Sequence, residues 1–206
     1  MIDNTEQGRQ MTDTAVIHPT FHHVNLKTTR LGEMIDYYRV LVGAEVVFSD
    51  QFGAWLSNDG ANHRIALLAF PGMEDDPGKD THTGMHHCAF EYGSFDELNA
   101  SYLRLRREGI EPAICLDHGM TLSYYYADPD GNNVELQCDA FGDWATGTEW
   151  MRTSEEFHSN PIGVFVQPEL IAAAAAEGQT FAEIHRRARE GEFAPETPPV
   201  ELPSAE

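Results

Sequence analysis

The sequence is poor in positively charged side chains. Only 13 of its 206 residues are lysine or arginine, against 34 aspartates and glutamates, so its formal net charge is −21 at pH 7 with neutral histidines. A chain with this charge repels phosphate backbones and anionic lipid surfaces. We therefore expect neither nucleic acid nor a membrane as a partner.

Long apolar runs, secretory features and cysteine are also scarce. The longest apolar run, residues 170–176, has seven residues, whereas a membrane-spanning helix needs about 20. Residues 1–7 have no basic start, apolar middle or small-residue cleavage site. The three cysteines are odd in number and widely spaced, so we expect them to be reduced core side chains. They are Cys88, Cys115 and Cys138. Together these features predict a cytoplasmic protein.

Apolar residues are nevertheless abundant enough to build a core. Hydrophobic residues make up 41% of the chain and aromatic residues 10%, which excludes wholesale disorder. The pattern along the chain predicts a loosely ordered arm at residues 1–17, a folded domain at residues 18–140 and an extension at residues 141–206.

The central domain has the pattern of two copies of one βαβββ unit, at about residues 21–70 and 84–138. Phe-His-His-Val-Asn-Leu at the start of the first copy is matched by Met-His-His-Cys-Ala-Phe at the start of the second. In the first copy, a helix is predicted at residues 31–42 and strands at residues 21–28, 44–49, 53–57 and 63–70. In the second copy, a helix is predicted at residues 95–108 and strands at residues 85–91, 110–116, 121–127 and 133–138. The predicted fold class is therefore α+β, with two tandem modules.

The extension has a different character. Residues 143–159 are aromatic and polar, and the end of the chain from residue 195 is rich in proline and glutamate. Between them, residues 168–176 and 180–190 predict two short helices, followed by a disordered acidic tail. We expect this extension to wrap the core and stabilise it, with a direct part in substrate binding as the alternative.

Strand alternation places metal-binding side chain types on one face of the sheets. In three predicted strands an apolar pair faces the helix-covered core, while His23, His87 or Glu135 takes the other face. Two histidines and one carboxylate can form a facial triad that leaves coordination positions open. This ligand set suits Fe(II) best, with Mn(II) and Zn(II) as alternatives. The neighbours His22 and His86 are expected to point to the opposite face, and each is the alternative ligand to the histidine beside it.

A tight turn connects the last two strands of the second module. Residues 128–131 read Asp-Pro-Asp-Gly, in which Pro129 presets the turn and Gly131 permits a positive φ. The turn joins antiparallel strands and therefore determines where Tyr125 and Glu135 lie relative to each other.

The paired modules and this turn resemble the vicinal-oxygen-chelate superfamily of glyoxalases, bleomycin resistance proteins and dioxygenases. In that superfamily two βαβββ modules form one open, barrel-like cleft around a metal. The stretch from His118 to Glu135 is similar to the signature of type I extradiol ring-cleavage dioxygenases, here in a compact one-domain form. The matching pattern is His118-x6-Tyr125-x2-Asp128-Pro129-x-Gly131-x3-Glu135. Leu116 and Tyr124 depart from the usual flanking residues, which leaves the substrate subtype open.

The resemblance implies roles for six residues. The metal ligands of the extradiol dioxygenases correspond to His23, His87 and Glu135. Their acid–base histidine corresponds to His63, and the residues that contact the diol oxygens correspond to His118 and Tyr125. The implied activity is an Fe(II)-dependent dioxygenase that inserts O2 into a catechol-type aromatic diol and cleaves the ring next to the diol. The resemblance also implies association into a homo-oligomer.

Two other functions stay open at this stage. A non-redox isomerase, epimerase or lyase of the same superfamily would use Glu135 and an ion such as Zn(II) as a Lewis acid, without consuming O2. A metal-free protein that binds and sequesters an aromatic drug would need no metal, and the three ligand-type residues count against it.

Overall fold

The computed structural model describes residues 16–200. Residues 1–15 and 201–206 lie outside the described residues, and with them most of the predicted N-terminal arm and the end of the predicted acidic tail. In the described part of the chain, no helix combines the length and the apolar character needed to cross a membrane.

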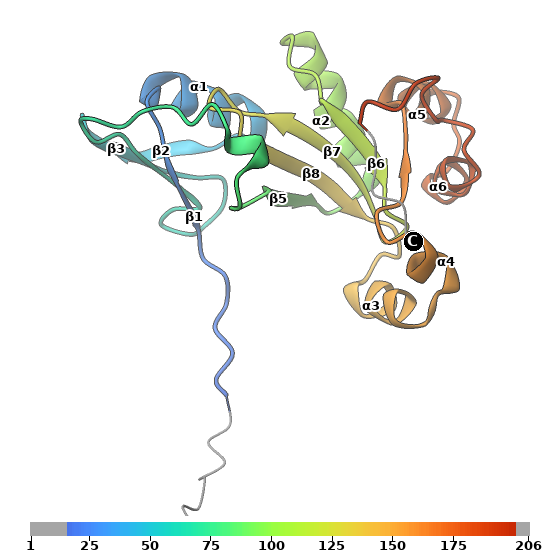
Figure 1. Ribbon diagram of the computed structural model, residues 1–206. Coiled ribbons are helices and arrows are strands. Elements are labelled where there is room, and N and C mark those ends of the chain that lie inside the picture. Colours follow the sequence, from blue (N-terminus) through green and yellow to red (C-terminus); the bar gives the residue numbers. More distant parts are fainter. Residues whose placement is uncertain (1–15, 201–206) are drawn as a thin grey trace, which may run out of the picture.

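Two sheets, one from each module, form the centre of the molecule (Figure 1). The first module consists of β1 (Val24–Lys27), α1 (Leu31–Val42), β2 (Glu45–Ser49), β3 (Gly53–Ser57) and β4 (Ile65–Leu68). The second consists of β5 (His87–Tyr92), α2 (Phe95–Arg107), β6 (Ile114–Asp117), β7 (Thr121–Ala127) and β8 (Asn133–Asp139). A single 3-10 turn, η1 (Lys79–Thr81), lies in the linker between them. The predicted α+β fold of two βαβββ modules is confirmed.

The two sheets share one strand order. It is β1-β4-β3-β2 in the first module and β5-β8-β7-β6 in the second, where β9 (Val164–Phe165) is added beyond β6. The pairs β1–β4 and β5–β8 are parallel, and the other neighbouring strands are antiparallel. β1 and β5 are therefore corresponding edge strands, and β8 is the direct neighbour of β5.

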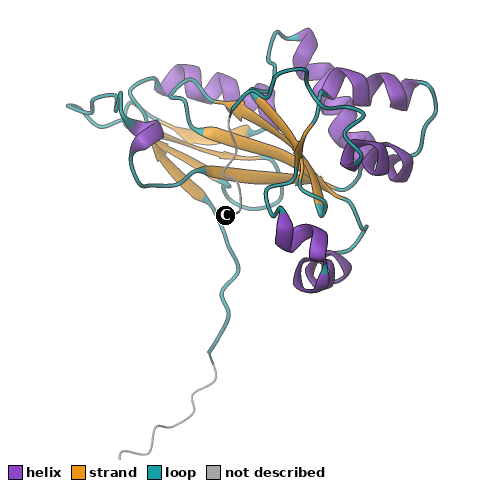
Figure 2. Cartoon of the chain, turned by 45° about the vertical axis from the view of Figure 1, so that its right-hand side comes forward, coloured by secondary structure: helices purple, strands orange, loops and turns teal. Residues whose placement is uncertain are grey.

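Helices α1 and α2 cover one face of the sheets (Figure 2). Met34, Tyr38 and Leu41 are the buried side chains of α1, at a spacing that keeps them on one helix face. α1 packs against β3 and β4, and α2 packs against β5 and β8. The buried side chains of both modules belong to one apolar cluster. Because each large apolar side chain contributes about 1.5–3 kcal/mol on burial, this cluster holds the modules together as one core.

Up to residue 200, the C-terminal extension contains four helices, two more than the sequence pattern predicted. They are α3 (Trp144–Thr153), α4 (Glu155–Ser159), α5 (Pro168–Ala176) and α6 (Phe181–Arg189). α3 and α4 lie on the side of the second sheet opposite α2 (Figure 1). The pattern missed them because Gly147 is the only buried residue in α3 and none is buried in α4, so an apolar stripe is missing. The capping residues Asp143 and Ser154, which accept hydrogen bonds from backbone N–H groups, were the available signal.

Candidate active site

The second module brings two of the predicted metal ligands together. His87 Nε2 lies 3.0 Å from Glu135 Oε2. The two residues come from the neighbouring parallel strands β5 and β8, where Glu135 is in register with Ala89, two residues after His87. Since residues two apart on a strand share a face, the pairing of these strands places both side chains on the same side of the sheet.

Tyr125 and His118 lie next to this pair. Tyr125 is in register with Glu135 across β7 and β8, and its ring centroid is 5.4 Å from that of His87. The Tyr125 hydroxyl is 2.9 Å from His118 Nε2. His118 follows β6 in the turn to β7, where its backbone N–H donates to the Thr121 carbonyl. Four predicted site residues thus form one cluster on a single module.

Glu135 has the environment of a carboxylate that needs a cation. Its exposed fraction is 5%, and in the described part of the chain its one ion-pair partner is His87, which is charged only when protonated. A buried charge is costly unless it is paired or binds a metal. Two ligand atoms held at right angles about 2.1 Å from an ion are roughly 3.0 Å apart. The distance between His87 Nε2 and Glu135 Oε2 therefore fits a shared metal.

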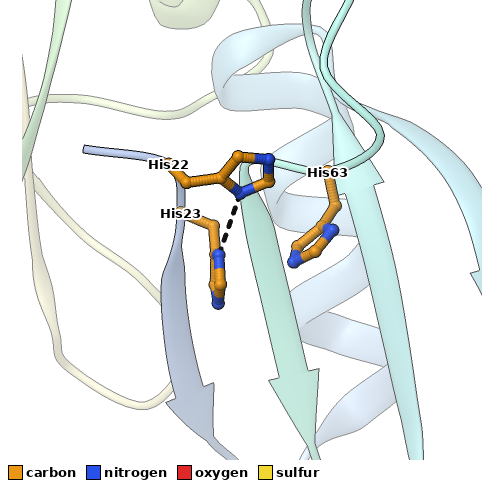
Figure 3. A group of neighbouring side chains, drawn as sticks. All are labelled: His22, His23 and His63. Carbon is orange, nitrogen blue, oxygen red and sulfur yellow. Dashed lines mark hydrogen bonds between the residues drawn. The ribbon is translucent and has the colours of Figure 1, made fainter. Parts of the chain in front are cut away.

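The first module holds a separate cluster of three histidines, His22, His23 and His63 (Figure 3). Their ligand atoms lie within 4.8 Å of one another. His22 Nδ1 is 3.0 Å from His23 Nδ1, and the ring centroids of His23 and His63 are 4.4 Å apart. Among residues 16–200 this is the one group of three close ligand atoms, so the structure does not bring His23 into the same tight group as His87 and Glu135.

The expectation that His22 and His86 point away from their neighbours is wrong. His22 lies against His23, and His86 Nδ1 is 2.8 Å from His87 Nδ1. β1 begins after His23, and β5 begins at His87. Because side chains alternate only within the pleated strand, alternation does not apply to the residues that precede it.

One cavity of about 820 Å³ is lined by residues of both modules. It runs along the edge strands β1 and β5 and is lined by His22, His23 and His87. His23 of the first cluster and His87 of the second thus face the same space, although they come from different modules.

The surroundings of the site shift the pKa values of three of its side chains, His63, His118 and Tyr125. Partial burial, followed by the neighbouring His23 and His22, lowers the pKa of His63 below its usual value. Burial lowers the pKa of His118, against the opposing effect of its hydrogen bond to a backbone carbonyl. Burial, reinforced by the charge of Glu135, raises the pKa of the Tyr125 phenol. At neutral pH both histidines are therefore available as proton acceptors and Tyr125 retains its proton.

Three residues near the site were missed from the sequence. Asp117 is fully buried at the end of β6, and its Oδ2 lies 2.7 Å from His185 Nδ1. Arg189, one turn after His185 on α6, donates to the Asp117 carbonyl at 3.0 Å. The available signals were an aspartate in an otherwise apolar strand and a histidine–arginine pair at i,i+4 spacing, which shares one helix face.

Known proteins resemble this chain over both modules and into the extension. Residues 20–136 match the family model of the Glyoxalase/Bleomycin resistance protein/Dioxygenase superfamily. Biphenyl-2,3-diol 1,2-dioxygenase 2 from Rhodococcus globerulus is 37% identical over 180 residues, which cover 87% of this chain and 94% of the relative. Biphenyl-2,3-diol 1,2-dioxygenase 3 from the same organism is 36% identical over 172 residues, covering 84% and 90%. A glyoxylase/bleomycin resistance protein/dioxygenase domain from Frankia sp. EAN1pec has a similar fold, with a TM-score of 0.52 at 17% identity, covering 62% and 96%.

Proposed function

Because the chain belongs to the Glyoxalase/Bleomycin resistance protein/Dioxygenase superfamily, we propose that it is an extradiol ring-cleavage dioxygenase acting on a catechol-type aromatic diol and O2. Two relatives that are 37% and 36% identical carry the name biphenyl-2,3-diol 1,2-dioxygenase, which supports this reaction class. The observation that carries the proposal is the cluster of His87, Glu135, Tyr125 and His118. It combines ligands for a metal with groups that exchange protons.

We infer that His23, His87 and Glu135 hold Fe(II), with Mn(II) as the alternative ion. The buried Glu135 carboxylate and its 3.0 Å distance from His87 support this assignment, and His23 opens into the cavity that His87 also lines. An Fe(II) ion held by these residues would supply open coordination positions and one-electron redox chemistry. The side chains of the protein then orient the diol and move its protons.

Tyr125 and His118 would accept a proton from the diol. The Tyr125 hydroxyl lies between the Glu135 side of the site and His118 Nε2, with which it shares a hydrogen bond. A diol hydroxyl can donate to the Tyr125 oxygen while Tyr125 donates to the lone pair of His118 Nε2. Since the pKa of His118 is lowered, this lone pair is available at neutral pH. Proton transfer by such positioned groups contributes about 10²–10⁴-fold to a rate.

His63 would serve the reaction from the first module, next to His23. Its lowered pKa keeps the imidazole neutral at pH 7, and its ring lies 4.4 Å from that of the inferred ligand His23. From this position His63 can take up a proton and return it during one turnover.

The reaction is tested by oxygen uptake. The full-length protein is loaded anaerobically with Fe(II) and given a panel of small catechols that includes 2,3-dihydroxybiphenyl. We expect one O2 to be consumed for each diol, with a yellow ring-opened product in the absorbance scan.

Adjacent tyrosines on β7 provide a matched pair of variants. Tyr125→Phe should lower kcat by about 100-fold, because it removes the hydroxyl next to His118. Tyr124→Phe should leave kcat unchanged, because Tyr124 faces the helix-covered core, where its hydroxyl has no hydrogen-bond partner among the described residues. Equal activity of the two variants would remove Tyr125 from the mechanism.

The iron bound by single variants tests whether the inferred ligands or the three-histidine cluster hold the metal. Glu135→Ala and His23→Ala should lose bound iron, whereas His22→Ala should retain it. Retention of iron in Glu135→Ala together with its loss in His22→Ala would assign the metal to the cluster instead.

The same measurements separate the alternative functions. Bound metal without oxygen uptake would favour a non-redox isomerase, epimerase or lyase that is active with Zn(II). A parent protein that binds no metal would favour an aromatic-ligand binding protein.

We also propose that the protein is cytoplasmic and that it forms a homo-oligomer. The three cysteines are free in the structure, which suits a reducing compartment. The edge strand β2 is exposed along its whole length, and Val47 and Phe48 have exposed fractions of 59% and 57%. An apolar sheet edge of this kind favours pairing with a second copy, which light scattering would measure.

A further inference from the structure

We propose that the C-terminal extension is a positioning device for His118. The Ile162 carbonyl selects the tautomer of the His118 imidazole, and His185 and Arg189 fix the preceding residue, Asp117. We call the contacts of His185 and Arg189 with Asp117 the Asp117 clamp. The inference rests on the proposed function of His118 as a proton acceptor, and it assigns His185 and Arg189 as positioning residues for that step.

The tautomer follows from the two hydrogen bonds of the His118 ring. Nδ1 lies 2.5 Å from the Ile162 carbonyl oxygen, and Nε2 lies 2.9 Å from the Tyr125 hydroxyl. A carbonyl can only accept, so Nδ1 must carry the hydrogen. A neutral imidazole has one N–H, and Nε2 is therefore left with a lone pair that accepts from Tyr125. The opposite tautomer would place two acceptors, Nδ1 and the carbonyl, against each other.

The Ile162 carbonyl reaches His118 because the backbone of the extension approaches β6 closely. β9 pairs with β6, with Val164 in register with Asp117. Gly163, between Ile162 and β9, has a φ of 93°, and a Cβ at this position would lie 2.1 Å from the Asp117 carbonyl oxygen. Only glycine lets the backbone at residue 163 lie this close to the Asp117 carbonyl. Gly163 therefore allows the Ile162 carbonyl to reach His118.

The Asp117 clamp fixes the residue directly before His118. Asp117 is fully buried, and its carboxylate accepts from the Gly119 N–H at 2.8 Å and interacts with His185 Nδ1 at 2.7 Å. Arg189 Nη1 donates to the Asp117 carbonyl at 3.0 Å and lies 3.6 Å from Oδ1. A buried carboxylate with both oxygens occupied has little freedom to move, and removal of one partner leaves a costly uncompensated group.

The residue directly after His118 is held by the same extension. Trp150 of α3 packs on Gly119, where a Cβ would lie 2.2 Å from the Trp150 ring. The Trp150 ring centroid is 5.7 Å from that of Phe141 and 5.4 Å from that of Phe157, which fixes the indole in an aromatic group. The extension therefore contacts the residues on both sides of His118 as well as its ring. A segment that only stabilised the fold would not need to converge on one turn.

The tautomer can be read without any activity measurement. Long-range proton–nitrogen spectra of the ¹⁵N-labelled full-length protein distinguish protonated from unprotonated imidazole nitrogens, and the signals of His118 are those lost in His118→Gln. The parent should show a protonated Nδ1 and an unprotonated Nε2. His185→Ala and Arg189→Ala should give a mixture of tautomers and lower kcat by about tenfold, with KM changed by less than about twofold. His185→Asn, whose amide N–H replaces Nδ1–H, should restore both readouts.

Arg186→Ala is the matched control. Arg186 lies on the same helix and carries the same charge, but its partner is Glu190 on the surface, at 2.5 Å, so its removal should leave tautomer and kcat unchanged. A parent protein with the proton on Nε2 would overturn the inference, even if the clamp variants fail to fold. Folded clamp variants with the parent's tautomer and kcat would overturn it as well. If the tautomer is found and no diol is cleaved, the proposed function fails while the positioning of His118 stands.

Discussion

At the scale of single residues, the burial of His118 links its protonation to the stability of the fold. Its pKa in the folded protein is lower than the usual value for histidine, about 6.5 in an unfolded chain. As the pH falls below 6.5, the unfolded chain binds the proton first, and the free energy of unfolding decreases. Above this pH both states are neutral at this residue, and the free energy of unfolding no longer depends on it.

We therefore expect the urea midpoint of the parent to fall between pH 7 and pH 5, and that of His118→Gln to fall less. The measurement is a set of urea titrations at pH 5, 6, 7 and 8. His158→Gln replaces an exposed histidine of α4 and serves as the control, which should follow the parent. A parallel decline in all three proteins would show that other groups cause the acid sensitivity.

The site residues differ in how far they could be predicted from the sequence. His87 and Glu135 follow from strand alternation within β5 and β8, because both lie inside the strands. The placement of His22 could not follow from alternation, because it precedes β1. Asp117 and His185 are 68 residues apart, and their contact depends on where α6 packs, which no local pattern specifies.

At the scale of secondary structure elements, α6 depends on its N-terminal cap. A helix of 9 residues is too short to be stable alone in water. Thr180 Oγ1 accepts from the Glu183 N–H at 3.3 Å, and Glu183 Oε2 accepts from the Thr180 N–H at 2.9 Å. Thr180→Ala should therefore lower the free energy of unfolding by about 1 kcal/mol, measured by urea titration.

Thr197→Ala is the control for this substitution. Thr197 is exposed in the same C-terminal segment, and in the described part of the chain no helix follows it. Its replacement should leave the urea midpoint unchanged. A Thr180→Ala protein as stable as this control would mean that tertiary contacts, and not the capping box, hold α6 in place.

Several helices and strands have the bounds that the sequence pattern predicted, among them β3 and β7. α1 and α5 occupy residues 31–42 and 168–176, as predicted. In α1 the buried Met34, Tyr38 and Leu41 produce the apolar period of a helix. α3 and α4 were not predicted because they bury little against the core. β4 begins two residues after the predicted start, since His63 belongs to the loop before the strand.

At the scale of the whole molecule, Arg30 joins the two modules and their linker. Arg30, which directly precedes α1, donates from Nη1 to Asp130 in the β7–β8 turn at 2.5 Å and forms an ion pair with Asp75 of the linker. Lys79 of the same linker donates to Asn132 in that turn at 3.0 Å. These contacts connect the first module to the second at the end of β1 remote from His23.

Arg30→Ala should lower the urea midpoint of unfolding. Asp130, whose side chain is only 10% exposed, would lose its charge partner, and a buried group without a partner is unfavourable. Arg39→Ala is the control, because Arg39 forms an exposed pair with Asp36 at 3.6 Å, a type that contributes little. Since His23 and His87 come from different modules, weaker coupling should also reduce the iron retained after chelation by Arg30→Ala. Loss of stability with full iron retention would show that the core cluster alone aligns the two halves of the site.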